Sequence, residues 1–298
     1  MRKLLTCLKN PYRICLPLAS RGLFDSMPDE KYLKLMYKAR MGRKLDLVHP
    51  TAYNEKLNWL KLHDRKPIYT TMVDKLEAKQ FIGNKIGMEY IVPVYGEWNS
   101  VEEIAWDTLP NQFVIKTNHD SGSVVICKDK NTFDFEEARK ILNRSMRHDY
   151  YLHAREWPYK NVQHRIFAER FLNMGDALID YKVMCFNGKP YAIQLNYVSA
   201  NRHSQDFYDT NWNLLNISQN SYAPVSGVAT EKPQELETML TLSEKLAKDT
   251  YCLRVDWFIA EGRLYSGELT FFDGAGFSPF DDYGMDVELG KHIILPTD

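Results

Sequence analysis

The stretch that decides the fold is Leu253-Arg-Val-Asp-Trp-Phe-Ile-Ala-Glu-Gly-Arg-Leu-Tyr-Ser-Gly-Glu-Leu-Thr270. Apolar residues on both sides of Glu261-Gly262 predict two antiparallel strands joined by a tight turn. Arg254 and Asp256 alternate with apolar neighbours, so they share one face of their strand. Counting back from the turn places Glu268 on the facing strand, close to Asp256.

Two carboxylates on the inner face of a sheet repel each other unless a cation lies between them. Mg²⁺ binds through one or two carboxylates and completes its shell with substrate phosphates. The alternative is a pair of carboxylates on a solvated face. The aromatic pairs Trp257-Phe258 and Phe271-Phe272 make full solvation of this hairpin an unfavourable arrangement. Asp256 and Glu268 are therefore the predicted metal ligands.

A second motif lies upstream, where the apolar run Phe113-Val-Ile ends in Lys116. A lysine at the end of a buried strand is costly to desolvate unless an anion meets it. The loop that follows carries Gly122 between Ser121 and Ser123, and small residues let backbone N–H groups approach a phosphate closely. The pattern indicates a phosphate-binding loop, with an ordinary hairpin turn as the alternative.

Two further segments suit a nucleotide site. Phe167-Ala-Glu-Arg-Phe-Leu172 could offer backbone groups to an adenine edge, or it could be an ordinary strand. Asp180 and Lys182 share one face of the next predicted strand. Lys182 could reach a phosphate from the side opposite Lys116, or it could form a surface ion pair with Asp180.

The segment from Arg144 to Arg165 interleaves basic residues with aromatic rings, a mixture that suits a carboxylate, a phosphate or a sugar. We expect it to close over a carboxylate substrate, and a solvated amphipathic segment is the alternative. The predicted substrate contacts are Arg155, Trp157, Tyr159 and Lys160.

Hairpins alternate with helices along the whole chain, which predicts an α+β fold with antiparallel pairing. Asn54 is a plausible N-cap of one helix, and Ser100 with Glu103 matches a capping box for a short helix before Trp106. Helices are predicted at about 28–37, 74–86, 135–146 and 234–249, strands at 113–115, 124–126 and 165–172, and hairpins over 180–198, turning at Asn187-Gly188, and 253–272.

Composition excludes several classes. Lys and Arg number 38 against 39 Asp and Glu, so a general nucleic-acid binder has little support. Five cysteines without a CxxC pattern indicate a reducing, cytoplasmic compartment. Residues 1–24 are basic and lack acids, but polar residues interrupt the apolar stretch that a signal peptide needs. This segment either contacts the anionic inner face of the membrane peripherally or is a frayed basic terminus.

Taken in order, these pieces resemble the ATP-grasp fold, and in particular its TupA-like branch, which is associated with bacterial surface-polysaccharide synthesis. The resemblance covers about residues 45–298. The stretches that resemble this branch most are Asn54-Glu-Lys-Leu-Asn-Trp59, Asp74-Lys75, Arg155-Glu-Trp-Pro-Tyr-Lys160 and Gly267-Glu-Leu-Thr-Phe271.

The resemblance implies two α+β subdomains that clasp ATP, preceded by a helical N-terminal region. We expect a basic, helical segment over 1–50, an N-terminal α/β region over 51–110, a lysine and glycine-loop subdomain over 111–172, and a metal-binding subdomain over 173–298.

The resemblance also implies roles for individual residues. Lys116 contacts the phosphates and adenine N7, together with the loop around Gly122, and Lys182 binds a phosphate. Thr270 stands where many relatives have Asn, which is a stronger metal ligand. The implied sets are Glu169, Arg170, Phe171 and Leu172 for adenine, Asp256, Glu268 and Thr270 for Mg²⁺, and Arg254 and Lys182 for catalysis.

The activity implied is that of an ATP-dependent ligase, which activates a carboxylate as an acyl phosphate and joins it to an amine or amino acid. The carboxylate is expected on a sugar or polysaccharide precursor. A glycosyltransferase of the same pathway is the main alternative, but no DxD motif occurs, and Asp281-Asp282 is a poor substitute. A nucleotide-binding assembly protein would have no need of Asp256 and Glu268.

Overall fold

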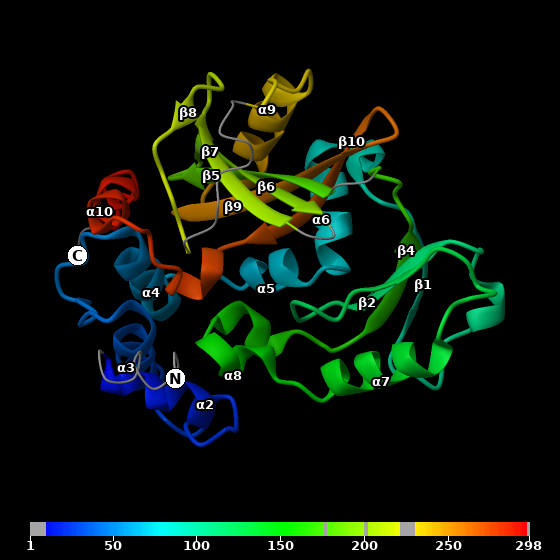
Figure 1. Cartoon of the computed structure of the whole chain (residues 1–298), viewed down its shortest axis with the longest axis horizontal. Coiled ribbons are helices and arrows are strands. Elements are labelled where there is room, and N and C mark those ends of the chain that lie inside the picture. Colours follow the sequence, from blue (N-terminus) through cyan, green and yellow to red (C-terminus); the bar gives the residue numbers. More distant parts are fainter. Residues whose placement is uncertain (1–9, 176–177, 200–201, 221–229, 297–298) are drawn as a thin grey trace.

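Two antiparallel sheets form the framework of the protein, which is described by a computed structural model over residues 10–175, 178–199, 202–220 and 230–296. The strand order is β10-β9-β5-β6-β7-β8 in the larger sheet and β1-β4-β2-β3 in the smaller one (Figure 1). The predicted α+β class is confirmed. The strands are β1 (Val94–Trp98), β2 (Phe113–Thr117), β3 (Val125–Cys127), β4 (Ile166–Arg170), β5 (Leu178–Phe186), β6 (Lys189–Ser199), β7 (Arg202–Asp209), β8 (Leu214–Leu215), β9 (Cys252–Ala260) and β10 (Arg263–Thr270).

Helices precede, separate and follow these strands. No helix of the described part of the chain is long and apolar enough to span a membrane. The α-helices are α2 (Cys15–Ala19), α3 (Asp29–Met41), α4 (Tyr53–His63), α5 (Ile68–Val73), α6 (Glu77–Ile86), α7 (Phe135–Met146), α8 (Tyr150–Ala154), α9 (Leu236–Ala247) and α10 (Tyr283–Lys291). The 3₁₀-helices are η1 (Pro11–Ile14), η2 (Met88–Tyr90), η3 (Trp106–Thr108), η4 (Trp157–Asn161) and η5 (Asp273–Gly276).

The larger sheet has one apolar and one polar face. Helix α9 covers the apolar face, where the indole Nε1 of Trp257 donates to Ser243 Oγ at 2.9 Å (Figure 1). Val183, Ile193 and Val255 are fully buried. Side chains alternate along a strand, so Arg254 and Asp256 of β9 point to the opposite face.

Both predicted hairpins of this sheet form. The turn residues Asn187-Gly188 have φ of 48° and 79°, and Glu261-Gly262 have φ of 53° and 70°. Positive φ at both central residues matches the twist of the flanking strands, and glycine adopts it at little cost.

A β-bulge in the second hairpin sets the position of Glu268. Gly267 and Glu268 of β10 together oppose the single residue Asp256 of β9. A Cβ at Gly267 would lie 2.6 Å from a ring carbon of Phe258, so a larger residue there would have to displace that ring. The bulge therefore holds Glu268 beside Asp256.

The smaller sheet packs against α7, whose predicted bounds of 135–146 are confirmed. Asp134 caps this helix by accepting from Glu137 N at 2.9 Å. Phe113 and Ile115 of β2 and Leu142 of α7 are fully buried between the two elements.

Three local predictions are wrong. Ala52, not Asn54, is the N-cap of α4, and the Asn54 amide instead donates to Asp286 Oδ1 at 2.9 Å. No helix occupies 100–105, where the Glu103 carboxylate caps a turn by accepting from Asn99 N. Helix α6 begins at Glu77, because the carboxylate of Asp74 binds the first free N–H groups of the helix.

The structure contradicts the prediction that Arg155 binds a substrate. Its side chain is 1% exposed, and its guanidinium donates to the carbonyl oxygens of Phe24 at 2.8 Å and Asp25 at 2.9 Å. It also lies 4.4 Å from the ring centroid of Tyr32. Trp157 is buried too, and its Nε1 donates to Asp64 O at 3.1 Å. Both side chains hold the N-terminal helices against the segment that follows α8.

We predict that Arg155→Leu lowers the free energy of unfolding by roughly 3 kcal/mol, because it leaves buried carbonyl oxygens without a donor. Urea unfolding followed by tryptophan fluorescence measures the loss. Arg147→Leu is the matched control, since Arg147 is exposed in the same basic segment. Equal stability of the two variants would contradict a structural role for Arg155.

Candidate active site between the two sheets

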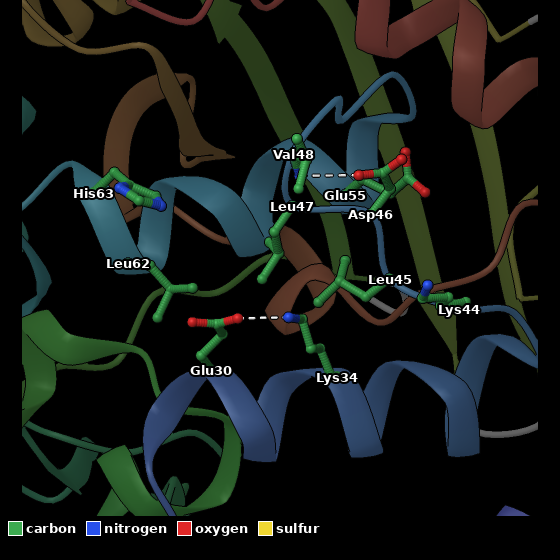
Figure 2. Close-up of a pocket in the computed structure, with 10 residues that line it drawn as sticks. All are labelled: Glu30, Lys34, Lys44, Leu45, Asp46, Leu47, Val48, Glu55, Leu62 and His63. Carbon is green, nitrogen blue, oxygen red and sulfur yellow. Dashed lines mark hydrogen bonds and ion pairs between the residues drawn. The ribbon is translucent and has the colours of Figure 1, made fainter. Parts of the chain in front are cut away.

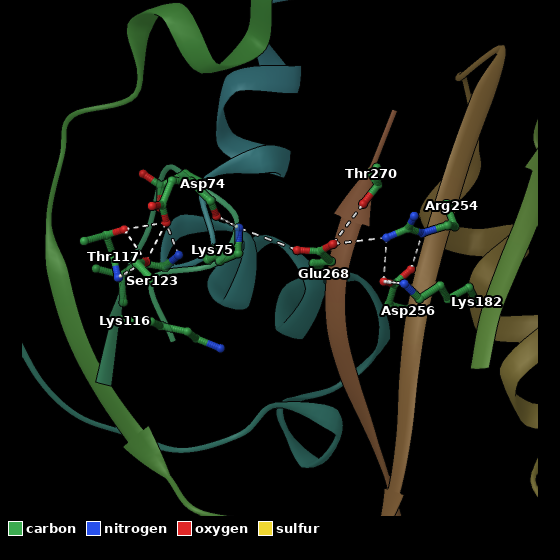
Figure 3. Close-up of polar contacts among 12 residues, drawn as sticks. Asp74, Lys75, Lys116, Thr117, Ser123, Lys182, Arg254, Asp256, Glu268 and Thr270 are labelled. Atoms are coloured by element: carbon green, nitrogen blue, oxygen red, sulfur yellow. Dashed lines mark hydrogen bonds and ion pairs between the residues drawn. The ribbon is translucent and has the colours of Figure 1, made fainter. Parts of the chain in front are cut away.

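Arg254 is the centre of a buried charged cluster on the polar face of the larger sheet. Its Nε and Nη2 donate to Asp256 Oδ1 at 2.7 Å and Oδ2 at 2.8 Å, and Nη2 also donates to Glu268 Oε1 at 3.1 Å (Figure 3). Its Nη1 contacts Asp273, in η5. Burial would lower the pKa of Arg254, but the charges of Asp256 and Asp273 outweigh it and raise the pKa well above its ordinary value.

Lys182 extends the cluster onto the neighbouring strand. Register pairs Lys182 of β5 with Asp256, and Lys182 Nζ lies 3.8 Å from Asp256 Oδ2 and 4.0 Å from Asp180 Oδ2. Burial raises the pKa of Asp180 to about 6, although the charge of Lys182 acts in the opposite direction. The structure thus brings together four residues that were singled out from the sequence: Lys182, Arg254, Asp256 and Glu268.

The smaller sheet contributes a second group of charges. Lys116, near the end of β2, and Lys79, on α6, hold the Glu169 carboxylate at 2.5 Å and 2.8 Å. Burial opposes ionisation of Glu169, but the two lysines lower its pKa to about 2. Lys116 and Glu169 are residues that the sequence predicts for the site, and Lys79 is a further residue that the structure adds.

Lys75 connects the two groups of charges. Its Nζ donates to Asp120 O at 2.6 Å, on the loop after β2, and lies 3.5 Å from Glu268 Oε2 on β10 (Figure 3). Little in the sequence points to Lys75 or Lys79 as site residues. Lys75 lies in the Asp74-Lys75 stretch that resembles the family, and Lys79 follows it by one helical turn.

The glycine loop after β2 is held from within by one carboxylate. Asp120 accepts from the hydroxyls of Thr117 at 2.7 Å, Ser123 at 2.5 Å and Ser145 at 2.6 Å. The Ser123 side chain therefore points inward, and only its backbone could meet a phosphate. Ser121 and Gly122 are exposed, and nothing lies within 4 Å of a Cβ built on Gly122.

The predicted adenine segment joins the two sheets. Arg170 forms an ion pair with Glu261, in the turn between β9 and β10. Leu172 is buried beside Tyr265 and Ala260 of the larger sheet, and Phe171 is half-buried. This placement is compatible with a hinge, and the contact with adenine stays a prediction.

Tyr159 and Lys160 differ from each other in placement. Tyr159 is half-buried and packs on Tyr150, with ring centroids 4.8 Å apart. Burial and then the charge of Glu156 raise the pKa of Tyr159, and the charge of Glu268 contributes in the same direction. Lys160 is exposed on the surface. Of the four predicted substrate contacts, Arg155 and Trp157 are buried and Lys160 is on the surface, whereas Tyr159 lies near the charged cluster.

The carboxylates fit a Mg²⁺ ion that arrives with a nucleotide. No group of three or more His, Cys, Asp or Glu side chains that could hold a metal occurs within the described ranges. Asp256 and Glu268 supply two carboxylates, and each carboxylate can accept further bonds beside those from Arg254. Because Mg²⁺ needs only one or two carboxylates when phosphates complete its shell, this donor set suffices. Thr270 Oγ1 donates to Glu268 Oε1 at 3.3 Å.

A hollow of about 680 Å³ lies elsewhere, beside α3, α4 and the loop between them (Figure 2). Its lining includes Glu30 and Lys34, whose charges pair with each other, and Leu45, Leu47 and Leu62. It contains no residue of the charged cluster, so we do not place the reaction there.

We predict that Glu169→Gln removes a pH-dependent part of the stability. A carboxyl group with a folded pKa near 2 and an ordinary unfolded pKa near 4.3 stabilises the fold above about pH 4.3, and this contribution is lost as the pH falls towards 2. The shift is worth on the order of 3 kcal/mol. Urea unfolding from pH 7 to 3 should show the difference between wild type and variant shrinking below pH 4.5. A difference that does not vary with pH would contradict the ion pairs of Glu169 with Lys79 and Lys116.

Comparisons with solved structures find ligases of the ATP-grasp kind. D-alanine–D-alanine ligase from Bacillus anthracis, complexed with ATP, is 17% identical, with 67% of this chain and 54% of that chain covered and a TM-score of 0.38. The same ligase from Helicobacter pylori is 15% identical, with 82% and 69% covered and a TM-score of 0.43. The ATP-grasp ligase PsnB, complexed with its minimal precursor, Mg and ADP, is 10% identical, with 91% and 72% covered and a TM-score of 0.41.

The chain spans about half the length of the first of these ligases. A comparison with curated protein sequences found no match. The model of the TupA-like ATP-grasp family matches residues 55–294. Members of the ATP-grasp superfamily are ATP-dependent ligases. Since the matched residues make up most of the chain, the protein belongs to the TupA-like ATP-grasp family.

Proposed function

We propose that the protein is an ATP-dependent carboxylate–amine ligase that joins an amine or amino acid to a carboxylated sugar or polysaccharide precursor. Family membership supports the ligase class. The observation that carries the proposal is the convergence of Arg254, Lys182 and Lys75 on Asp256 and Glu268, between the two sheets. Such a set of fixed charges suits the transfer of a phosphoryl group.

The reaction has two steps. A carboxylate oxygen of the substrate attacks the γ-phosphorus of ATP, ADP leaves, and an acyl phosphate forms. The amine nitrogen then attacks the acyl carbon, the C–O bond to phosphate breaks with its electron pair leaving on phosphate, and the amine loses a proton. Lys182 and Lys75 would offset charge on the transferring phosphoryl group, and the planar guanidinium of Arg254 would orient the acyl phosphate.

The smaller sheet would hold the nucleotide. Lys116, with a side chain 20% exposed, is free to exchange part of its contact with Glu169 for a phosphate and adenine N7. The exposed backbone at Ser121-Gly122, continuing to Ser123, would cradle phosphate oxygens, and the segment Glu169–Leu172 would line the adenine. Asp256 and Glu268, with Thr270, would hold Mg²⁺, which neutralises phosphate charge when bound.

The cellular setting is inferred from the cysteines and from the N-terminal segment. Cys15, Cys127, Cys185 and Cys252 are free thiols in the part of the chain that is described, which favours a reducing cytoplasmic compartment. Residues 1–9 of the basic N-terminal segment lie outside the described residues. Ile14 and Leu23 are 63% and 59% exposed beside Arg13 and Arg21, so peripheral contact with an anionic membrane face stays part of the proposal.

The function is tested by incubating the protein with Mg-ATP, a panel of uronic acids and a panel of amines. We expect ADP release that requires both partners, with a product whose mass equals that of the amide. Transfer of sugar from UDP-sugars without ATP consumption would instead support the glycosyltransferase and contradict the ligase.

We predict that Lys116→Met weakens ATP binding at least tenfold, because a charged partner in a partly desolvated site contributes about 1.5–3 kcal/mol. Calorimetric titration with a non-hydrolysable ATP analogue measures the change. Lys140→Met serves as the control, since Lys140 is exposed on α7 and pairs with Glu137 of the same helix. Unchanged affinity in Lys116→Met would show that this lysine does not contact the nucleotide.

We predict that Asp256→Asn and Glu268→Gln reduce Mg²⁺-dependent turnover far more than they reduce ATP binding. The charge they supply matters most where charge develops on the transferring phosphoryl group. Steady-state ADP release over a Mg²⁺ titration is the measurement, and Glu237→Gln, an exposed carboxylate on α9, is the control. Wild-type rates at low Mg²⁺ in both variants would remove these residues from the metal site.

A further inference from the structure

A second set of buried polar side chains extends away from the charged cluster across the larger sheet. Register pairs Gln194 of β6 with Lys182, Asn196 of β6 with Asp180, and Gln205 of β7 with Asn196. Cross-strand partners share a face, so these side chains lie on the same face as the charged cluster. We call Asp180, Gln194, Asn196 and Gln205 the amide row.

Three oxygen atoms of the amide row lack a partner. Asp180 Oδ1, Gln194 Oε1 and Gln205 Oε1 are buried, and none accepts a hydrogen bond from any described residue. Gln194 and Gln205 are 4% and 8% exposed. The one side-chain bond within the row runs from Gln205 Nε2 to Asn196 Oδ1, at 3.1 Å.

Buried acceptors without donors are rare in folded proteins, and apolar side chains of the same size would pack at least as well. Single buried oxygens without a partner also occur at Asn54 and Ser204, so the amide row is distinguished by having three of them on one face, beside the charged cluster. The carboxylate oxygen of Asp180 accepts hydrogen bonds, and the amides of Gln194 and Gln205 present oxygens in the same row, so a ligand with several hydrogen-bond donors would complete them.

The spacing of the acceptors selects among donor-bearing ligands. They belong to three successive strands, and neighbouring strands lie about 4.8 Å apart, so the row spans roughly 10 Å. A single ammonium group cannot reach across that length. A ring that carries several hydroxyl groups can, and each hydroxyl offers one donor.

We propose that the amide row is the subsite that binds the hydroxyl groups of a sugar substrate. The inference rests on the proposed ligase function and names the part of the protein that would recognise the sugar. One end of the row meets Lys182, whose Nζ lies 4.0 Å from Asp180 Oδ2 and 3.8 Å from Asp256 Oδ2. A sugar on the row would thus have its carboxylate directed towards Lys182 and Arg254. We therefore assign sugar recognition to the amide row and not to the segment around Arg155, whose side chain is buried against backbone carbonyls.

The test measures binding without turnover. Protein saturated with Mg²⁺ and a non-hydrolysable ATP analogue is titrated with glucuronate, galacturonate, cyclohexanecarboxylate and cyclohexylamine. We expect a uronate to bind, cyclohexanecarboxylate to bind at least tenfold more weakly, and cyclohexylamine not to bind. Gln194→Met and Gln205→Met should each weaken the uronate at least tenfold while leaving the affinity for the ATP analogue unchanged.

Ser204→Ala provides the matched control. Ser204 lies on β7 next to Gln205, and its buried Oγ also lacks a partner among the described residues, but it faces the other side of the sheet. This variant should bind the uronate as wild type does. Gln194→Met should not lower the melting temperature, because it removes a buried oxygen that has no partner. Cyclohexanecarboxylate, which lacks hydroxyl groups, tests the same contacts on the wild-type protein.

The inference is overturned if wild-type protein binds neither uronate, if cyclohexanecarboxylate or cyclohexylamine binds as tightly as the uronate, or if both Met variants keep wild-type affinity. Its failure is distinguishable from failure of the ligase function. Binding of a uronate through the row without amide formation with any amine would leave the inference standing and reject the ligase. Amide formation, together with unchanged uronate affinity in both Met variants, would support the ligase and reject the amide row as the sugar subsite.

Discussion

The buried guanidinium of Arg254 is the constraint on which the rest of the site depends. An arginine keeps its charge in a protein interior, so it must be surrounded by acceptors. Asp256 comes from the same strand, Glu268 from the bulge of the facing strand, and Asp273 from η5. Three features bring these carboxylates to one cation. They are the tight turn at Glu261-Gly262, the β-bulge at Gly267-Glu268 and the direction of the chain after β10.

The two sheets carry complementary halves of this electrostatic arrangement. On one side, Lys116 of the smaller sheet and Lys79 of α6 surround one carboxylate, Glu169. On the other side, carboxylates of the larger sheet and of η5 surround one arginine, Arg254. Lys75 contacts both halves, through the loop after β2 and through Glu268. An anionic ligand entering between the sheets would compete for these lysines, and a cation entering with it would compensate Asp256 and Glu268. This exchange is the physical basis of the proposed nucleotide site.

Local sequence patterns predict most of the helices and hairpins. The features that they do not predict depend on contacts between residues far apart in the chain. Hairpins with glycine turns and the amphipathic helix 135–146 are encoded by neighbouring residues, and the structure contains them. The Arg155 prediction was wrong because a basic residue among aromatic rings looks the same in sequence whether it meets a ligand or the backbone of a distant segment. Lys79 was missed since a lysine on a helix gives no signal of a buried partner. The unpaired oxygens of the amide row became visible only with the register of β5, β6 and β7.

The most direct test of the account follows the carboxylate oxygen. The protein is given Mg-ATP, an amine and a uronic acid in which both carboxylate oxygens are ¹⁸O, and the inorganic phosphate is examined by mass spectrometry. Attack of the carboxylate on the γ-phosphorus places one labelled oxygen in the bridge of an acyl phosphate, and amine attack on the acyl carbon releases it with phosphate. The account predicts one ¹⁸O per phosphate released and one retained in the amide. Unlabelled phosphate, with both labelled oxygens still on the sugar, would contradict carboxylate activation as the reaction of this site.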